Sequence, residues 1–397
     1  MVTLAVLFDR LGPYHRARLR AAGKRMNVTA VELAGESAAY NWDPVQDAAN
    51  VERVTLFEQA DTTEISTTIL DTALTKALAE HRPNTVAIPG WSSAGALSAL
   101  RWCTTTSTPA VLMSATTAHD FTRHWWREWP KKRLVSLFDA ALVGGMPHRD
   151  YLAQLGLSPR RVALGYDAVD NAHFRKGADL AREQAGRLRE EYDLPERYVL
   201  ASARFVPKKN LPRLIRAFAR YRRAAPATAW DLVLLGDGAE RPAVEAAIQE
   251  EGVAGSVHLP GFKQYDDLPV YYGLAEAFVH ASTTEQWGLV VNEAMAAGLP
   301  VLVSDRCGCA PDLVTEGENG FTFDPYDADA LAALLETVAH GAADRRAMGR
   351  ESRKQIAQWG PERFARGLEE AVESAHSQPP TSASFLDDLL MKALAHR

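Results

Sequence analysis

Cysteine is scarce in this chain of 397 residues, which contains only Cys103, Cys307 and Cys309. An odd number of cysteines in so long a chain offers no disulfide framework and is typical of a reducing compartment. Cys307 and Cys309 are separated by one glycine, but no second pair of metal ligands accompanies them. The sequence therefore predicts two packed thiols on a turn, with a zinc site as the minor alternative.

Long apolar runs are also absent. The longest uncharged runs, such as residues 294–303, fall far short of the roughly 20 residues that a membrane-spanning helix needs. Residues 1–8 are apolar, but Asp9 and Arg10 follow at once and no basic leader or cleavage site is present. This pattern indicates a first strand rather than a signal peptide. We therefore expect a cytoplasmic protein without a membrane span.

Positive charge is not in excess. The chain contains 44 Lys and Arg against 50 Asp and Glu, which gives a formal net charge of −6. A protein of this balance has no global basic field to hold a nucleic-acid backbone, so nucleic acid is not an expected partner. The rest of the composition, 47% hydrophobic and 24% charged, is typical of globular proteins. The length predicts two or more domains.

Short apolar, β-branched segments alternate with amphipathic helical segments along the chain. This alternation predicts βαβ units and parallel sheets, hence an α/β fold with two doubly wound, Rossmann-like domains that face each other across a cleft. The expected strands of the first domain are residues 3–8, 28–33, 85–88, 110–114 and 140–143. Those of the second domain are residues 198–201, 231–235, 256–259, 277–280 and 301–304.

The domain boundary is placed where the alternation breaks. Residues 164–174 fit neither period, and a charged helix is expected to follow over residues 179–192. We therefore expect an N-terminal, acceptor-binding domain over residues 1–172 and a C-terminal domain over 173–375. The Pro- and Ser-rich segment 378–384 predicts a linker to a short helical tail, so residues 376–397 form the third part.

Two glutamates mark the first candidate site. A strand is expected to end at His280, a turn follows, and a helix begins near Gly288. The free N–H groups and positive dipole of such a helix form an anion site suited to phosphate. Glu285 and Glu293 would flank the bound anion and accept hydroxyls, as a nucleotide sugar demands. The alternative is that both carboxylates complement the helix dipole and face solvent.

Three basic residues mark the second candidate site. Arg204, Lys208 and Lys209 lie in the loop after the strand over residues 198–201. A guanidinium and an ammonium that converge on a diphosphate would neutralise the charge of a departing nucleotide. A solvated basic loop is the alternative, and it suits Lys208 better than Lys209.

These residues together resemble a known family. Glu285 and Glu293 with seven residues between them, Arg204 with Lys209, and the turn Leu235-Gly-Asp-Gly238 resemble the retaining glycosyltransferases of family four, also called glycosyl transferases group 1. The resemblance covers residues 139–325. It implies the GT-B fold and the transfer of a sugar from a nucleotide donor to a hydroxyl acceptor, with retained anomeric configuration and without a metal or other cofactor.

The resemblance also implies roles for single residues. Glu285 would contact the donor sugar and Glu293 the ribose, while Arg204 and Lys209 bind the diphosphate; Glu285, Arg204, Lys209 and His119 are the expected catalytic residues. UDP is the favoured nucleotide, with GDP and ADP open. The remaining expected donor-binding residues are Gly288, Leu289 and Val290 at the helix start and Gly261, Phe262 and Lys263 against the base.

Acceptor-binding residues are expected at strand ends of the N-terminal domain. By its position, His119 resembles the histidine that the family places beside the reacting sugar. The other candidates are Tyr14, His15, Trp91, Ser92 and Asp120. Attack on the front face of the sugar is the favoured mechanism, with Glu285 as a nucleophile the alternative.

Residues 123–133 contain five Lys or Arg, one Glu and three tryptophans. Such a composition resembles a membrane-surface signature. We expect instead a helix whose tryptophans pack on the sheet while its charges face water. A weak peripheral membrane contact and the binding of an anionic acceptor are the alternatives.

Other functions are compatible with the same fold. One is a GT-B coupling enzyme or epimerase acting on a nucleotide-linked sugar or cyclitol, and another is a non-catalytic nucleotide-sugar-binding partner. A phosphorylase is disfavoured, because no lysine lies in an obvious pyridoxal phosphate context. The retained set of Glu285, Glu293, Arg204 and Lys209 favours catalysis. The Ala- and Arg-rich composition indicates a bacterial source, so natural-product or polysaccharide biosynthesis is expected, by a monomer or a homodimer.

Overall fold

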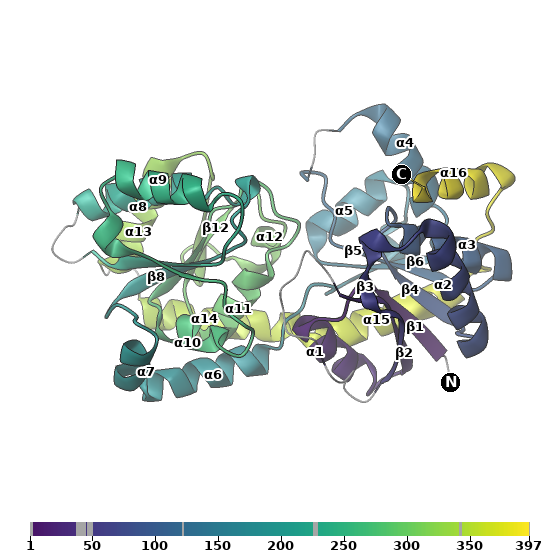
Figure 1. The fold of residues 1–397 in the computed structure, drawn as a ribbon, viewed down its shortest axis with the longest axis horizontal. Helices are drawn as coiled ribbons and strands as arrows, with labels where there is room; N and C mark the ends of the chain where they lie inside the picture. Colours follow the sequence, from purple (N-terminus) through teal and green to yellow (C-terminus); the bar gives the residue numbers. More distant parts are fainter. Residues whose placement is uncertain are drawn as a thin grey trace. The chain divides into compact units, whose positions relative to one another are not determined.

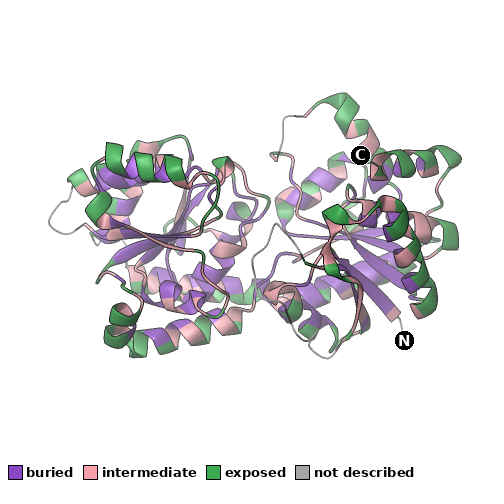
Figure 2. Ribbon diagram, in the orientation of Figure 1, coloured by how far each residue is buried: buried purple, intermediate pink, exposed green. Residues whose placement is uncertain are grey.

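The computed structural model describes residues 3–36, 45, 51–120, 123–224, 229–340 and 344–396. They form two compact units (Figure 1). The first unit comprises Met1–Val169 and Gly360–Arg397, and the second comprises Asp170–Trp359. Each unit has its own parallel sheet, and Figure 2 shows that the central strands of both sheets are buried while the outer faces of the helices are exposed. No described helix is long and apolar enough to cross a membrane.

The sheet of the first unit has seven strands in the order β3-β2-β1-β4-β5-β6-β7. Every neighbouring pair is parallel. The central strands are mainly apolar because helices cover both faces of the sheet. The strands are β1 (Thr3–Phe8), β2 (Asn27–Glu36), β3 (Glu52–Asp61), β4 (Thr85–Pro89), β5 (Ala110–Ser114), β6 (Ala140–Val143) and β7 (Val162–Leu164).

The sheet of the second unit has six strands in the order β10-β9-β8-β11-β12-β13, all parallel. This is the Rossmann order, in which the direction of succession reverses between the first and fourth strands. The predicted α/β class with two doubly wound domains is therefore confirmed. The strands are β8 (Tyr198–Ser202), β9 (Asp231–Leu235), β10 (Val257–Gly261), β11 (Ala277–His280), β12 (Val301–Ser304) and β13 (Gly320–Phe323).

Three strands, β3, β7 and β13, were not predicted from the sequence. All three lie at the edges of their sheets. An edge strand is paired on one side only and is partly exposed, so it lacks the continuous apolar run that marks a central strand. β3 carries charged residues at both ends, and β7 has only three residues. Their positions thus depend on the neighbouring strands rather than on their own sequences.

Helices cover both faces of each sheet (Figure 1). In the first unit they form two separate cores, one around α2 and α3 and the other around α1 and α15. The helices of this unit are α1 (Pro13–Ala22), α2 (Thr67–His81), α3 (Ala94–Thr106), α4 (Trp125–Val135), α5 (Met146–Gln154), α15 (Pro361–His376) and α16 (Phe385–Ala395). Those of the second unit are α6 (Asn171–Glu183), α7 (Ala185–Glu191), α8 (Leu211–Ala224), α9 (Arg241–Glu250), α10 (Leu268–Leu274), α11 (Leu289–Ala297), α12 (Ala310–Leu313), α13 (Ala328–Ala339) and α14 (Arg345–Ile356).

The predicted domain boundaries need correction. The second unit ends at Trp359 rather than at residue 375, because the apolar face of α15 packs on the first sheet beside α1. α16 belongs to the first unit as well, and Arg133 binds its Asp387 at 2.6 Å. The predicted helix over residues 179–192 is two helices, and the first begins at Asn171 because the Asp170 carboxylate caps it.

Candidate functional site

The densest cluster of contacts between predicted site residues lies at the carboxyl ends of β8 and β11. These two strands are adjacent, and the order of strands reverses between them, which is where ligands bind in such sheets. β11 ends at His280, and α11 begins at Leu289. Gly288 precedes the helix with a φ of +107°, which glycine adopts readily. The predicted succession of strand, turn and helix is confirmed.

Glu285 is the centre of this cluster. Its carboxylate forms an ion pair with Lys209 and a second one with Lys208, at 3.4 Å between Nζ and Oε1. His280 Nε2 lies 3.5 Å from Oε2, and the Ser282 hydroxyl donates to the same oxygen at 3.4 Å. Only 12% of the Glu285 side chain is exposed. The carboxylate is therefore held in one position by groups from two loops.

The surroundings of Glu285 keep its carboxylate ionised. Burial alone would raise the pKa of this carboxyl group, but the hydrogen bond with His280 and the charges of Lys209 and Lys208 outweigh it and lower the pKa well below its usual range. Burial lowers the pKa of His280, so its imidazole is neutral at pH 7. The result is a fixed negative charge beside two ammonium groups.

Hydrogen bonds tie the two loops together. The Thr283 N–H donates to the Lys208 carbonyl at 2.8 Å. Asn210 has a φ of +59°, and its amide donates to the Ala281 carbonyl at 3.1 Å. Asparagine tolerates this left-handed conformation better than most residues. The lysines are thus positioned by the backbone of the β11 loop as well as by the carboxylate.

Arg204 lies earlier in the β8 loop, where it is exposed. The backbone of this loop packs directly on the turn after β9: the Ala203 N–H donates to the Leu235 carbonyl at 3.1 Å. A Cβ at Gly236 would lie only 1.8 Å from the Ala203 carbonyl oxygen. The predicted tight turn at Gly236 therefore serves the close approach of the loop that carries Arg204.

The predicted base-binding residues lie at the same edge of the sheet. Gly261 ends β10 with a φ of +81°, and its carbonyl accepts from the Gly236 N–H at 3.0 Å. The Phe262 side chain is 40% exposed, and Lys263 Nζ lies 5.6 Å from the centre of the Tyr271 ring. An exposed aromatic ring at this edge is suited to stacking on a base.

Glu293 differs from its predicted environment. It lies in α11 with no exposed surface, and the Tyr272 hydroxyl donates to Oε2 at 2.6 Å. The alternative that both glutamates face solvent is wrong, since Glu285 and Glu293 are both largely buried. The contact of Glu293 with a ribose stays a prediction, and the structure shows a packing role for this side chain within the second unit.

The segment Cys307-Gly308-Cys309 supports the loop that carries Glu285. The Gly308 N–H donates to the Glu285 carbonyl at 2.9 Å, and the Cys309 N–H donates to the Trp287 carbonyl at 3.2 Å. Cys307 and Cys309 are buried, and burial raises the pKa of the Cys307 thiol. Within the described ranges, no group of three or more His, Cys, Asp or Glu is arranged to hold a metal ion.

Three residues of this site were not predicted from the sequence. His280, Ser282 and Asn210 all contact either Glu285 or its loop. The available signal was their position: His280 is the last residue of β11, Ser282 lies two residues later, and Asn210 ends the loop between β8 and α8. In such sheets ligands bind outside the carboxyl ends of the strands, where these residues lie.

The predicted acceptor residues of α1 are partly explained by the helix itself. Tyr14 and His15 are half-buried in its first turn. The Gly12 N–H donates to His15 Nδ1 at 3.0 Å, so the ring satisfies a free N–H group at the helix start. Burial, together with the charge of Arg18, lowers the pKa of His15 to about 3. At pH 7 the imidazole is neutral and carries its proton on Nε2.

Trp91 and Ser92 follow β4 and differ in exposure. Trp91 is 7% exposed and packs with Leu97 and Leu100 in the core around α2 and α3. It is therefore a core residue rather than the acceptor-binding surface that the sequence predicted. Ser92 is exposed and keeps its predicted role as a hypothesis.

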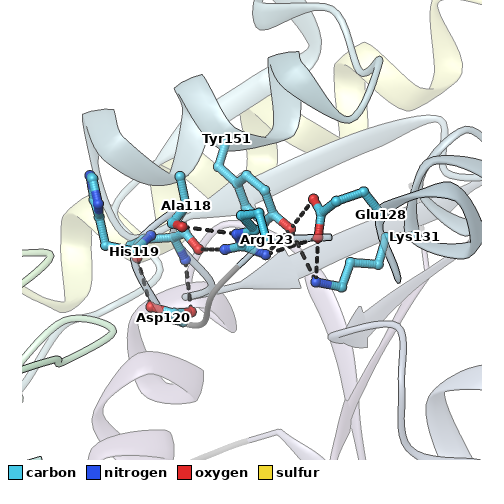
Figure 3. A network of polar contacts seen from close by, with 8 residues as sticks. Ala118, His119, Asp120, Arg123, Glu128, Lys131 and Tyr151 are labelled. Atoms are coloured by element: carbon cyan, nitrogen blue, oxygen red, sulfur yellow. Dashed lines mark hydrogen bonds and ion pairs between the residues drawn. The ribbon is translucent and has the colours of Figure 1, made fainter. Parts of the chain in front are cut away.

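His119 and Asp120 lie in a tight turn after β5. The Asp120 carboxylate accepts from the Thr117 N–H at 2.9 Å and from the Thr117 hydroxyl at 2.6 Å. Asp120 thus shapes the turn. The His119 side chain is exposed, and Figure 3 shows its ring pointing away from the polar network behind it. His119 is therefore the member of this pair that is accessible to a ligand.

An arginine anchors this turn to α4 and α5. Arg123 donates to the carbonyls of Thr117 and Ala118, and its guanidinium also contacts Glu128 at 3.2 Å and the Tyr151 hydroxyl at 2.5 Å (Figure 3). Burial would raise the pKa of Glu128, but hydrogen bonds from nearby cations and from Tyr151 lower it. Part of the basic segment is thus used internally rather than facing water.

The tryptophans of α4 contradict the expectation that they pack on the sheet. Trp125, Trp126 and Trp129 are 84%, 54% and 58% exposed. Only Leu134 and Val135 of this helix are buried, because the helix touches the rest of the unit mainly at its C-terminal end. The interpretation as an ordinary amphipathic helix is wrong, and the surface-binding alternatives become the relevant ones.

Comparison with known proteins adds to this geometry. Residues 186–355, which include Arg204, Lys209, Glu285 and Glu293, match the model of the family described as glycosyl transferases group 1. The chain contains a group 1 glycosyltransferase domain. The resemblance inferred from the motifs is thereby confirmed, and the domain holds every predicted donor-binding residue.

Two similar proteins show the extent of the likeness. A GDP-mannose-dependent alpha-(1-6)-phosphatidylinositol monomannoside mannosyltransferase of Mycolicibacterium smegmatis is 32% identical over 45% of this chain and 49% of its own length. A D-inositol 3-phosphate glycosyltransferase of Salinispora arenicola is 32% identical over 57% of this chain and 52% of its own length. The chain thus spans about half the length of each of these relatives.

Solved structures share the fold over nearly the whole chain. A sucrose-phosphate synthase of Thermosynechococcus elongatus has a TM-score of 0.76 at 20% identity and covers 95% of this chain and 100% of its own. HepE of Anabaena in complex with UDP has a TM-score of 0.73 at 17% identity, with 94% and 100% covered. At such identity the likeness shows the GT-B fold alone.

Proposed function

We propose that the protein is a retaining glycosyltransferase that moves a sugar from a nucleotide donor, with UDP favoured, to a hydroxyl acceptor without a metal ion. One observation carries this proposal: the Glu285 carboxylate and the Lys209 and Lys208 ammonium groups meet where the strand order of the group 1 domain reverses. A carboxylate and cations side by side suit a ligand that presents both hydroxyls and a diphosphate.

Each part of the donor has a proposed partner. Glu285 accepts hydroxyls of the donor sugar, and Lys209 and Arg204 bind the diphosphate. The N–H groups at the start of α11 bind the distal phosphate, and the base lies against the segment from Gly261 to Lys263. When the diphosphate binds, it competes with Glu285 for Lys209, which frees the carboxylate for the sugar.

The proposed reaction is a front-face substitution. The bond between the anomeric carbon and the leaving phosphate oxygen breaks as the acceptor oxygen bonds to the same face of that carbon. The acceptor proton passes to the leaving diphosphate, and Lys209 and Arg204 stabilise the negative charge that remains on it. Nucleophilic attack by Glu285 on the anomeric carbon is the alternative route. Retention of configuration in the product would agree with both routes, and inversion would contradict both.

The donor test is a binding measurement. We expect one of UDP-, GDP- and ADP-glucose or -mannose to raise the melting temperature of the wild type equally with and without EDTA, because a ligand of the native state stabilises it. The double variant Arg204→Ala/Lys209→Ala should lose this shift, while Arg175→Ala/Arg216→Ala, which removes two exposed charges of the same unit, should retain it. A shift that requires a divalent ion would contradict the metal-independent reading.

The relatives are named for different sugars. One relative is named as GDP-mannose-dependent, and an alpha-D-kanosaminyltransferase of Streptomyces kanamyceticus is 30% identical over 53% of this chain. We propose an acceptor from bacterial natural-product or polysaccharide biosynthesis, bound beside the exposed His119. An epimerase would bind the donor equally well but would release no free nucleoside diphosphate on addition of a sugar acceptor, and a coupling enzyme would release it only from a cyclitol-linked nucleotide.

We also propose that the first unit contacts anionic membrane surfaces through α4 and α16. The two helices pack together, joined by Arg133 and Asp387, and each exposes large apolar side chains. Arg127 and Lys132 add exposed positive charge on α4. Apolar side chains beside cations complement an anionic lipid surface. The exposed apolar residues are Trp125, Trp126, Trp129, Phe385, Leu386 and Leu389.

Vesicle binding tests this contact. We expect the wild type to cosediment with vesicles of phosphatidylcholine and phosphatidylglycerol but only weakly with phosphatidylcholine alone. Trp125→Ala/Trp129→Ala should reduce binding to the anionic vesicles at least fivefold. The control Ile69→Ala/Tyr326→Ala removes two exposed apolar side chains elsewhere and should not. If the tryptophan variant and the control variant bound the anionic vesicles equally, the proposal would be contradicted. Binding of a soluble phosphorylated sugar to the same tryptophans would favour the anionic-acceptor alternative.

A further inference from the structure

The second unit contains a cavity at the opposite edge of its sheet from Glu285. Its volume is about 780 Å³, within the range of about 300–1,000 Å³ that small-molecule sites occupy. Arg197, Glu276 and Pro300 line it, and these residues directly precede β8, β11 and β12. Because the strands are parallel, their amino ends lie together, away from the carboxyl ends that carry the donor site. The cavity is therefore separate from that site.

Arginine dominates the lining of this cavity, which we call the arginine cavity. Seven arginines line it, together with the carboxylates Glu276 and Asp344. A third carboxylate, Asp179, binds two of the arginines from behind. Seven arginines against three carboxylates leave a formal excess of four positive charges, in a protein whose net charge is −6. The seven are Arg182, Arg189, Arg197, Arg345, Arg346, Arg350 and Arg353.

Four of these arginines are fixed by the protein. Arg182 and Arg353 share Asp179, at 3.1 and 2.5 Å, and both donate to the Ala297 carbonyl. Arg345 binds Glu276 at 3.3 Å, and Arg189 donates to backbone carbonyls. Rigid guanidinium groups are held at the wall before any ligand arrives, which lowers the entropic cost of binding.

Within the described part of the chain, the side chains of the other three arginines are unpaired. Arg197, Arg346 and Arg350 are exposed, and their side chains form no hydrogen bond or ion pair with the described residues. Even among the fixed arginines, Arg189 Nη1 and Arg353 Nε are buried without a hydrogen-bond acceptor. Burial and the charge of Arg353 lower the pKa of Arg182. The cavity thus presents donors and positive charge that the protein does not itself neutralise.

Two glycines make the crowded arrangement possible. A Cβ at Gly298 would lie 2.6 Å from Arg353 Nε, and a Cβ at Gly349 would lie 2.2 Å from the Gly298 carbonyl oxygen. α14 can therefore pack closely on the end of α11, and its successive turns bring Arg346, Arg350 and Arg353 to the cavity. On α14, Gly349 thus allows the close packing that places the three arginines at the cavity.

We propose that the arginine cavity binds a small anion that carries two or more phosphate groups. Guanidinium groups match phosphate oxygens with paired hydrogen bonds, and several of them can engage one polyanion at once. A formal excess of four charges favours a polyphosphate or a bisphosphorylated metabolite over a single phosphate. The proposed donor site lies at the carboxyl ends of the strands, so the donor nucleotide and the polyphosphate can occupy the protein at the same time.

Calorimetric titration with inorganic tripolyphosphate tests this site. The titration uses the full chain with Lys208→Ala/Lys209→Ala, which removes the donor-site ammonium groups. We expect one bound tripolyphosphate per chain, with orthophosphate binding at least tenfold more weakly. Adding Arg346→Ala/Arg350→Ala should weaken tripolyphosphate binding at least tenfold, and Arg197→Ala alone should weaken it several-fold. Both sets lie on exposed side chains, so the fold should be retained.

A control variant and a separate measurement of donor binding distinguish a failure of this inference from a failure of the proposed function. Arg175→Ala/Arg216→Ala removes two exposed arginines of the same unit outside the cavity and should leave tripolyphosphate binding unchanged. The proposal would be overturned if Arg346→Ala/Arg350→Ala left tripolyphosphate binding unchanged. It would also be overturned if the Lys208→Ala/Lys209→Ala chain bound no tripolyphosphate. The variant Arg346→Ala/Arg350→Ala with both donor-site lysines intact should still bind the sugar nucleotide. Its donor binding thus tests the donor site independently of the arginine cavity.

Discussion

Glu285→Gln should lower the turnover of the favoured donor and acceptor about 10²- to 10³-fold, the range for loss of one preorganised electrostatic contact. The substitution keeps the shape of the side chain but removes the negative charge that Lys209, Lys208 and His280 surround. The two ammonium groups would then lose the group that positions them. Steady-state release of nucleoside diphosphate measures the effect.

The lysines provide an internal comparison. Lys209 is 12% exposed and Lys208 is 37% exposed, so Lys209→Ala should cost more turnover than Lys208→Ala. Glu318→Gln removes an exposed carboxylate of the same unit and should leave turnover unchanged. Melting temperatures near that of the wild type would show that each variant is folded. Unchanged turnover in Glu285→Gln would contradict the site assignment.

Gly236→Ala should destabilise the second unit and abolish donor binding. The φ of +119° would cost alanine roughly 1–2 kcal/mol, and the new Cβ would lie 1.8 Å from the Ala203 carbonyl oxygen. Overpacking of this kind adds about 1–3 kcal/mol. Because the clash involves backbone, relief requires the loop that carries Arg204 to move.

Gly252→Ala is the matched control for this effect. Gly252 has a φ of +68°, but a Cβ there would meet nothing within 4 Å. Gly252→Ala should therefore lose only the free energy that the positive φ costs an alanine, without the overpacking cost. It should bind the donor like the wild type. Urea denaturation measures the free energy of unfolding of both variants. Equal destabilisation by the two substitutions would show that the loop contact at Gly236 is unimportant.

The central strands of both sheets could be predicted because their own residues carry the signal. β1, β5, β6, β9 and β11 were expected with the same bounds that the structure shows. Each is buried on both faces by helices, so each is mainly apolar. The edge strand β3 is polar at both ends and pairs only with β2, so its position depends on a neighbour far away in the sequence.

The end of the second unit could not be predicted for a related reason. α15 has an apolar face like that of any surface helix, and a helix of this kind can cover either sheet. Its Phe364, Leu368 and Val372 pack into the core that contains α1, which assigns it to the first unit. Sequence periodicity shows that a helix has an apolar face but does not show which surface that face covers.

At the site, the sequence by itself determined which side chains carry the chemistry. Glu285, Lys209 and the turn before α11 were evident because each follows a predictable strand, and parallel strands bring their carboxyl ends to one edge. Only the tertiary structure decided which partners hold them. It placed His280 and Ser282 on the carboxylate, buried Glu293 against Tyr272, and exposed the tryptophans of α4. Side-chain burial depends on packing between distant segments, and local sequence does not encode that packing.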